Sequence, residues 1–369
     1  MEMENKSGYY QENRRGRRRY RPYFPYDLTT LDNKIALNVE MMKKISNANF
    51  ALGTLDGAGY ANSRGLGIMT LLEINEGVNS LKLEGYHSTV ESYLVSQLHQ
   101  RKSDEELLLD RYMLCLKDGQ NKKMNMETLQ KMVNQFLGTE VGLRKEQTFI
   151  RYLGRDPFAP CKVETLPLAI QGYENYVASK EEFDELIKAA LLQYEIFTIQ
   201  PFEEGNGLLQ RFVSIVYLMN HNRLPYANLA LSDYFLKHKL AYEKAICSVS
   251  ETGNFEEWIQ FFLEAVKVAS INSMTIIINY DKMLQKHMSK ISESAFSDTI
   301  QAKLVKLLAY LQDHPVVEVK TTAKDLRLSF NTAANLIQIL SNLGLLKQVD
   351  DRNRNRYFLY IEMLNLLEV

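Results

Sequence analysis

The hydrophobic pattern of the chain is helical over most of its length. From Thr29 to about Val266, apolar residues recur at spacings of three and four, as on the buried face of an amphipathic helix. The spacing predicts helices over residues 32–55, 67–83, 88–100 and 104–116. We therefore expect a mostly α-helical fold.

Residues 141–163 interrupt this pattern. The segment 147–153 is rich in β-branched and aromatic residues, and Pro157 and Pro160 follow it in a loop. We predict a small β-hairpin within the helical body.

Two strongly apolar helices are predicted on either side of a polar loop. Residues 183–199 are apolar on most faces, which is typical of a central, buried helix, and Pro201 cannot continue it. A second apolar helix is expected over residues 208–219. The loop 203–207, Glu-Glu-Gly-Asn-Gly, is therefore an unusual polar, glycine-rich segment between two core helices.

The last part of the chain, residues 299–369, has the pattern of a separate unit. Its periodicity predicts helices and strands over residues 301–311, 322–326, 329–343, 345–349 and 357–361. This order, a helix followed by a helix-turn-helix and a hairpin, is that of a winged helix-turn-helix domain.

A winged helix binds DNA or serves as a protein-docking or dimer-forming module. The expected recognition helix has no Lys or Arg, although Asn331, Asn335 and Gln338 could contact bases. On the wing, three arginines could contact phosphates, namely Arg352, Arg354 and Arg356. Because a DNA reader usually has a stronger basic footprint, the docking interpretation is favoured.

The N-terminal residues 1–26 differ from the rest of the chain. Six arginines and no acidic residue lie between Asn13 and Pro22, and tyrosines are interleaved with them. Like charges repel and no apolar face is evident, so the pattern predicts a disordered tail. Such a tail either contacts nucleic acid or another acidic surface, or is simply solvated; solvation is the favoured interpretation.

Composition narrows the class of protein. The 369 residues carry 44 Lys and Arg against 45 Asp and Glu, a net charge of −1, which excludes a surface wholly suited to a polyanion. Cys115, Cys161 and Cys247 lie far apart and are predicted to be reduced thiols. We find neither an apolar run near the ~20 residues of a membrane span nor a signal-peptide core, and expect a cytoplasmic protein without membrane contact.

The polar loop is the strongest candidate for chemistry. Gly205 and Gly207 allow the backbone to turn tightly and expose its N–H groups, which join the free N–H groups at the start of the next helix. This arrangement favours an anion, Arg211 lies one turn further, and Glu204 could hold Mg²⁺ on the same phosphates. The residues indicate a phosphate or nucleotide site; a glycine-rich turn with surface carboxylates is the alternative.

Residues 200–211, Gln-Pro-Phe-Glu-Glu-Gly-Asn-Gly-Leu-Leu-Gln-Arg, resemble the Fic (Fido) motif HPFxxGNGRxxR. Gln200 replaces the histidine and Leu208 replaces the first arginine. Residues 80–85 resemble the family's inhibitory helix, and the segment from Gly142 to Pro160 resembles the flap that holds the target peptide. The resemblance covers roughly residues 30–268. It implies a Fic-fold helical core with a small β-hairpin flap, to which a winged-helix domain is commonly appended.

Members of this family transfer AMP from ATP to a protein hydroxyl, with Mg²⁺ as cofactor. The resemblance assigns roles to the following residues: Gly205, Asn206, Gly207 and Arg211 bind nucleotide, Glu204 binds the metal, Ser80 and Glu84 inhibit, Phe149, Ile150 and Arg151 form the target flap, and Gln200 occupies the position of the catalytic base. Glutamine cannot take a proton as histidine does. We therefore predict a protein that is inactive or strongly altered in activity.

Two alternative functions remain open at this point. One is an active AMP transferase that uses a different base, for example His87. The other is a transcriptional regulator with a winged helix, in which the core senses a nucleotide. The expected partners are ATP or another nucleotide, an unknown protein target, DNA through the winged helix or the Arg-rich tail, and a second copy in a homodimer.

The predicted organisation has five parts. They are the disordered Arg-rich tail (1–26), an N-terminal helical region with the inhibitory-type helix (27–110), the Fic core (111–268), a linker helix (269–298) and the winged-helix domain (299–369).

Overall fold

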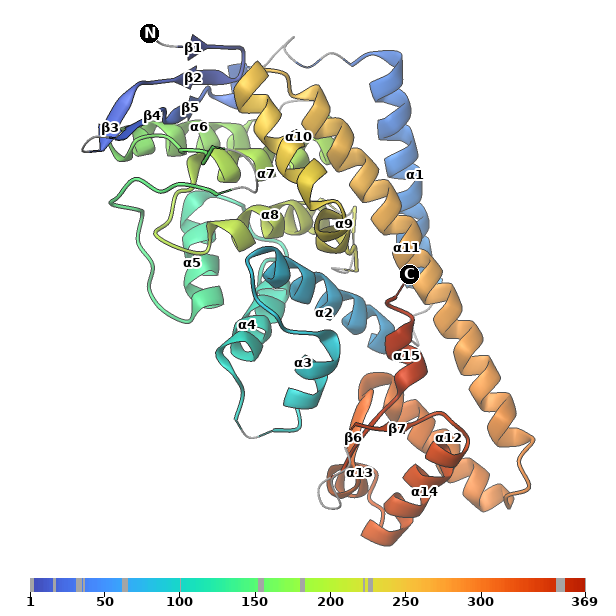
Figure 1. Cartoon of the computed structure of the whole chain (residues 1–369). Coiled ribbons are helices and arrows are strands. Elements are labelled where there is room, and N and C mark those ends of the chain that lie inside the picture. Colours follow the sequence, from blue (N-terminus) through green and yellow to red (C-terminus); the bar gives the residue numbers. More distant parts are fainter. Residues whose placement is uncertain are drawn as a thin grey trace.

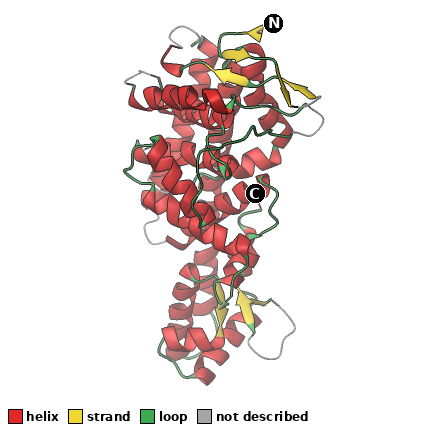
Figure 2. Cartoon of the chain, turned by 90° about the vertical axis from the view of Figure 1, so that its left-hand side faces the viewer, coloured by secondary structure: helices red, strands yellow, loops and turns green. Residues whose placement is uncertain are grey.

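The computed structural model confirms a mostly α-helical chain (Figure 1). It describes residues 3–15, 18–30, 35, 37–61, 66–99, 101–151, 156–179, 183–221, 223–224, 228–349 and 356–368. A larger helical body carries small strands at one end, and a long helix leads from it to a smaller C-terminal unit (Figures 1 and 2).

The larger body is built from eleven of the described helices. They are α1 (Val39–Ala61), α2 (Leu66–Leu83), α3 (Val90–Ser96), α4 (Asp104–Asp118), α5 (Met126–Leu137), α6 (Leu166–Ala178), α7 (Glu185–Ile199), α8 (Asn206–Asn220), α9 (Leu231–Lys237), α10 (Lys239–Thr252) and α11 (Glu256–Ser292). Two 3₁₀ turns, η1 (Leu28–Thr30) and η2 (Val163–Thr165), precede α1 and α6. All the helices predicted from the spacing are present, but α1 begins and ends later than the predicted 32–55, and α3 is shorter than predicted.

Helices α7 and α8 pack together at the centre of this body. In α7 every side chain from Leu186 to Ile199 is buried except that of Lys188, as the apolar pattern predicted. The indole Nε1 of Trp258 donates a hydrogen bond of 2.8 Å to the Ala190 carbonyl and so fixes α11 against α7. The loop between α7 and α8 is therefore held by a rigid core at both ends.

The predicted disordered tail is wrong for the part of residues 1–26 that the structure describes. The segment forms β1 (Met3–Glu4), β2 (Gly8–Tyr10), β3 (Asn13–Arg15), β4 (Arg18–Tyr20) and β5 (Tyr23–Pro25), paired as β1-β2-β5 and β3-β4. Tyr23 is fully buried, and the Ser7 hydroxyl donates a 2.8 Å hydrogen bond to the Val249 carbonyl of α10. The tyrosines of this segment supply the apolar surface that packs on the body, and the prediction of disorder gave too much weight to the arginines.

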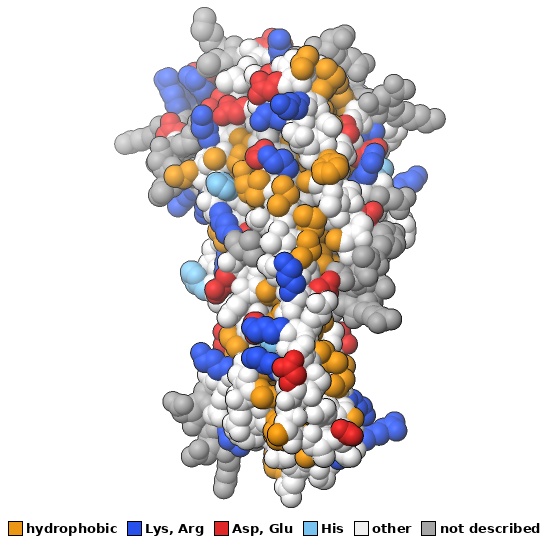
Figure 3. All heavy atoms as spheres, turned by 90° about the vertical axis from the view of Figure 1, so that its right-hand side faces the viewer, with side chains coloured by type: hydrophobic (Ala, Val, Ile, Leu, Met, Phe, Trp, Pro, Cys, Tyr) orange, Lys and Arg blue, Asp and Glu red, His pale blue; other side chains and the backbone are white. Residues whose placement is uncertain are grey.

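The helix α11 runs without interruption through the predicted boundary between core and linker. It lies alongside α1, and hydrophobic side chains gather at several places on the face seen in Figure 3. Of the described helices, only α11 is long and apolar enough to cross a membrane, although the sequence suggested none. Half of its most apolar stretch is buried inside the protein, as in a core helix.

The C-terminal unit contains the predicted helices and strands together with two elements that the pattern missed. Its elements are α12 (Asp298–Asp313), β6 (Val316–Glu318), α13 (Val319–Asp325), α14 (Phe330–Asn342), β7 (Lys347–Gln348), β8 (Tyr357–Leu359) and α15 (Ile361–Asn365). The strands form an antiparallel sheet in the order β6-β8-β7. The missed elements are β6 and α15, and Arg352 and Arg354 lie outside the described residues. The winged-helix assignment stays a prediction.

A buried polar cluster joins α11 to this unit. The imidazole of His287 is fully buried and contacts the Tyr360 hydroxyl at 2.7 Å and a Glu362 carboxylate oxygen at 2.8 Å. Lys286 Nζ donates to the other carboxylate oxygen at 2.8 Å. Burial lowers the pKa of His287, against the opposing effect of Glu362.

Candidate functional site

The polar loop begins where α7 ends, at Gln200. This residue has a positive φ of 47°, an uncommon conformation for a residue other than glycine. Its side-chain Nε2 donates a 3.1 Å hydrogen bond to the Phe197 carbonyl, one turn back in α7. Gln200 is only 9% exposed, so its amide caps its own helix.

A buried arginine that was not predicted as a site residue holds this corner in place. Arg144 is 2% exposed, and its Nε donates to the Gln200 carbonyl at 2.8 Å. Its Nη2 donates to the Ile199 carbonyl at 3.3 Å and to the Cys161 carbonyl. The guanidinium thereby satisfies the free carbonyl groups at the C-terminus of α7. The sequence signal was the short Gly-Leu-Arg segment before the flap, but the partners of Arg144 at the end of α7, Ile199 and Gln200, are more than fifty residues away.

Asn206 closes the loop rather than facing a ligand. Its side-chain oxygen accepts a 3.0 Å hydrogen bond from the Phe202 N–H, and its Nδ2 donates to the Phe202 carbonyl at 2.8 Å. Asn206 is the first residue of α8, so this double contact fixes the direction in which the helix begins. Asn206 therefore contributes to an anion site indirectly, by fixing the geometry of the N-terminus of α8.

The carboxylate of Glu84, at the end of α2, lies against the backbone of Gly207. A Cβ atom built on Gly207 would lie 2.2 Å from both oxygens of this carboxylate, so only glycine permits the approach. The free N–H groups and the positive end of the α8 dipole face this region. The predicted anion site therefore contains an anion supplied by the chain itself.

Arg211 links the same carboxylate to the interior of the protein. Its Nη2 donates to Glu84 Oε1 at 2.8 Å and to the Ser80 carbonyl at 2.8 Å, and its Nε donates to the Ser80 hydroxyl at 3.0 Å. Arg211 is 2% exposed. Burial by itself would lower the pKa of Arg211, but the negative charge of Glu84 raises it above its ordinary value. The guanidinium is therefore charged, and its Nε and Nη2 already have partners.

Comparison with known proteins matches residues 121–218 to the Fic/DOC family. This range contains the flap segment, α7, the loop and most of α8. The chain carries a Fic/DOC-family domain. The contacts that the predicted inhibitory pairing requires, between Ser80, Glu84 and Arg211, are present; the inhibitory role itself stays a prediction.

One solved Fic structure supports the fold, and two further Fic structures resemble the chain more weakly. The crystal structure of a Fic family protein from Desulfovibrio desulfuricans G20 has a TM-score of 0.55 at 14% identity, covering 86% of this chain and 95% of that one. A Fic-domain signaling protein from Bacteroides thetaiotaomicron VPI-5482 has a TM-score of 0.49 at 17% identity, and the match covers 65% of this chain and 97% of that one. A fragment of Fic-1 from C. elegans has a TM-score of 0.49 at 14% identity, and the match covers 66% of this chain and 73% of that one.

The second departure from the Fic motif, Leu208, lies inside the protein. Its side chain is 3% exposed and belongs to the hydrophobic core. The Fic motif has an arginine at this position, which here would have to displace core neighbours or extend its charged end towards solvent. The anion site of this Fic domain therefore has one guanidinium, that of Arg211, where the motif provides two.

Among the described residues, the flap of the Fic domain has one isolated β-bridge in place of a full hairpin. Ile150 and Phe158 exchange two backbone hydrogen bonds of 2.9 Å, while residues 152–155 lie outside the description. Phe149 is 36% exposed and Arg151 is exposed beside this pair. A second short pairing, between Leu143 and Phe202, joins the beginning of the flap segment to the motif loop.

The proposed metal ligand, Glu204, is an exposed residue of the motif loop. Within the described ranges, no group of three or more His, Cys, Asp or Glu side chains is arranged to hold a metal ion. Mg²⁺ is often bound by one or two carboxylates together with nucleotide phosphates and water. Glu204 fits this mode of binding, in which the nucleotide completes the site.

Glu76 is a buried carboxylate near Arg211 that sequence reasoning missed. It lies on α2, eight residues before Glu84 and four before Ser80, so the three share one face of the helix. Its carboxylate is fully buried and accepts hydrogen bonds from the Ser232 N–H at 2.7 Å and from the Ser232 hydroxyl. Burial raises the pKa of Glu76 from 4.5 to about 7, although the bonds from Ser232 and the charge of Arg211 oppose this.

We expect Glu76→Gln to alter how the stability of the protein depends on pH. The folded state holds the Glu76 proton up to about pH 7, whereas the unfolded chain releases it near pH 4.5. The stability associated with this proton is therefore present below pH 4.5 and lost as the pH rises through about 7. Urea unfolding from pH 4.5 to 7.5 should show a smaller decline for Glu76→Gln than for the wild type. Parallel curves for the two proteins would contradict this assignment.

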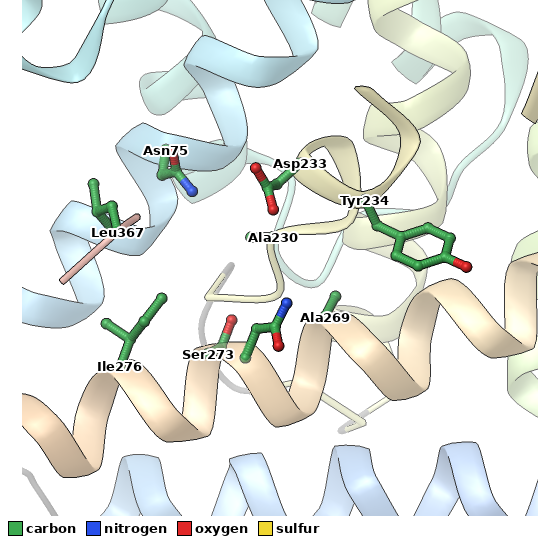
Figure 4. A pocket seen from close by; sticks show the side chains of 9 residues that line it. Asn75, Ala230, Asp233, Tyr234, Ala269, Ser273, Ile276 and Leu367 are labelled. Carbon is green, nitrogen blue, oxygen red and sulfur yellow. The ribbon is translucent and has the colours of Figure 1, made fainter. Parts of the chain in front are cut away.

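A small cavity lies beside α2, away from the anion site (Figure 4). Its lining includes Asn75, Asp233 and Ser273, from α2, α9 and α11. Ser273 is fully buried, and its hydroxyl has no hydrogen-bond partner among the described residues. The cavity volume is about 10 Å³, which matches a single water molecule and is far too small for a nucleotide.

Proposed function

We propose that this chain is a Fic-type protein adenylyltransferase homologue whose nucleotide site is closed by Glu84 and whose catalytic base is missing. The observation that supports it is the position of the Glu84 carboxylate, against Gly207 and paired with Arg211 at 2.8 Å. A phosphate of ATP would need the same guanidinium and the same helix N-terminus. Withdrawal of Glu84 would expose both.

In AMP transfer, a target hydroxyl forms a bond to the α-phosphorus of ATP and pyrophosphate leaves. Here the N–H groups at residues 205–207 and Arg211 would orient the phosphates, and the flap at residues 149–151 would position the target. Mg²⁺ on Glu204 would offset phosphate charge. The hydroxyl proton must pass to a base, and Gln200 offers only an amide that already donates to Phe197. Loss of a general base typically costs about 10²–10⁴-fold in rate.

The experiment for this proposal uses the wild-type protein and ATP labelled on the α-phosphate. After incubation with Mg²⁺ and a cell lysate, we expect label on proteins at or near the background of a protein-free control. Rapid, protein-dependent labelling would contradict the proposed inactivity and would favour another base; His87, exposed just beyond α2, would then be tested by His87→Ala.

A nucleotide-sensing DNA regulator is the second candidate. The observation that favours it is the exposure of Asn331, Asn335 and Gln338 on α14, where they are available for base contacts. It ranks second because α14 contains no Lys or Arg to pair with phosphates.

The cellular location of the protein and its oligomeric state are also proposals. Cys115, Cys161 and Cys247 are buried, free thiols, which supports a reducing, cytoplasmic location. For a homodimer, we favour α1 as the contact surface because Val39 and Phe50 are each 78% exposed there.

A further inference from the structure

The β3–β4 hairpin of the N-terminal segment is fixed to the flap. The ring of Tyr20 meets the ring of Phe149 edge-on, with centroids 5.2 Å apart. The N–H of Tyr23 donates to the Ala159 carbonyl at 2.8 Å, next to the flap residue Phe158. The Asn13 Nδ2 donates to the Tyr20 hydroxyl at 3.0 Å and steadies this ring. The hairpin therefore has a defined position beside the place where a target would bind.

The hairpin carries positive charges that face each other. Arg14 and Arg19 are directly opposite in the antiparallel register, and both side chains are exposed. Like charges at such a pair destabilise a hairpin. In the described part of the chain neither arginine forms an ion pair, whereas the neighbouring acid Glu12 lies 3.7 Å from Arg21. A bound carboxylate would relieve the repulsion between the two guanidinium groups.

We propose that the β3–β4 hairpin is a docking arm for an acidic segment of the target polypeptide, an inference that rests on the proposed function because it assigns the flap to a target. Charge complementarity selects an acidic partner. The position beside Phe149 selects a polypeptide, because the proposed function assigns this flap to a protein target. A nucleic acid is the other polyanion that these arginines could bind, and the experiment below includes it as a competing outcome.

The test measures peptide binding without ATP, so that it does not depend on catalysis. The probe is a fluorescent 12-residue peptide of alternating Glu and Ser, followed by anisotropy at low salt. We expect wild type to bind it and Arg14→Gln with Arg19→Gln to bind about tenfold more weakly. Arg14→Lys with Arg19→Lys should retain most of the binding. The melting temperature of the glutamine variant should stay level or rise, because a like-charge pair has been removed.

The matched control removes two positive charges far from the flap, through Lys303→Gln with Lys306→Gln, both exposed on α12. It should leave binding within about twofold of wild type. Equal losses in both variants would show an unspecific charge effect and overturn the proposal. A labelled oligo-dT strand that binds more tightly than the peptide, and is lost with the hairpin variant, would also overturn it by assigning the hairpin to nucleic acid.

The two proposals fail separately. Hairpin-dependent peptide binding together with robust AMP transfer by the wild type keeps the docking arm and overturns the proposed inactivity. Transfer by a repaired variant, as described below, without hairpin-dependent peptide binding keeps the transferase and removes the docking arm.

Discussion

ATP should bind at least tenfold more tightly to Glu84→Gly than to the wild type. The substitution removes the carboxylate from Gly207 and frees the Nη2 of Arg211, which now donates to Glu84 at 2.8 Å. A hydrogen bond between charged groups is worth about 1.5–3 kcal/mol, and about 1.4 kcal/mol corresponds to a factor of ten. Isothermal titration calorimetry with ATP and Mg²⁺ measures the change directly.

The same variant should be less stable than wild type when no nucleotide is present. Arg211 would remain buried without its charged partner, while its hydrogen bonds to Ser80 persist. Removing one partner of a buried ion pair typically costs about 3–5 kcal/mol, and the partial exposure of Glu84 places the expected cost at or below the lower end. ATP should therefore raise the melting temperature of Glu84→Gly more than that of wild type.

Glu84→Gln is the matched control because it keeps the length of the side chain and the helical backbone. It should share the gain in ATP affinity without the additional flexibility of glycine next to Gly85. Unchanged affinity in both variants, with the fold intact by circular dichroism, would count against Glu84 as an inhibitory residue.

AMP transfer should appear when histidine is restored at position 200 in the Glu84→Gly background. We expect at least about a hundredfold more labelled protein than in Glu84→Gly alone, because a general base contributes about 10²–10⁴-fold. The backbone at position 200 should accommodate Gln200→His, because histidine is one of the residues enriched at positive φ and its size is close to that of glutamine. The measurement is transfer from α-labelled ATP to the protein itself and to lysate proteins.

The second repair, Leu208→Arg, is best added as a separate step. Leu208 is 3% exposed, so burying an arginine there is expected to destabilise the folded protein, and this loss can mask any gain in phosphate binding. The triple variant is informative only if its circular dichroism and melting temperature stay close to those of the double variant. A folded, ATP-binding triple variant that transfers nothing would show that the degeneracy extends beyond the motif, with the flap as the next region to test.

Gln200→Ala in the wild-type background is the control for an active glutamine. Both proteins should transfer at background level. Robust transfer by the wild type that is abolished in Gln200→Ala would mean that Gln200 takes part in the reaction, and would refute the proposed inactivity.

Local patterns predicted the central helices well, because burial leaves a dense signal in the sequence. Residues 183–199 are apolar on most faces, and α7 is buried almost throughout. The N-terminal segment was predicted wrongly because its short strands each have two or three residues, too few for an alternating pattern to show. Its stability comes from tyrosines that pack on distant helices, and no local window contains those partners.

The candidate site was predicted only in part. Physical reasoning on Gly205, Gly207 and Arg211 indicated an anion site, and the resemblance supplied Ser80 and Glu84 from more than a hundred residues away. Asn206 turned out to bind its own loop. Arg144 and Glu76 were missed because their roles depend on burial and on partners such as Gln200 and Ser232, which only the folded chain brings near.

The bare backbone at Gly207 has room for one negatively charged group, and Glu84 is attached to the same molecule. Glu84 therefore behaves as a tethered ligand whose effective concentration does not change with dilution and is of millimolar order for short flexible tethers. The apparent dissociation constant for a nucleotide is the intrinsic one divided by the fraction of molecules in which α2 has withdrawn its carboxylate. Occupancy by ATP is thus set by a ratio between two competitors, and an event that shifts α2 by a small distance alters that ratio without touching the nucleotide.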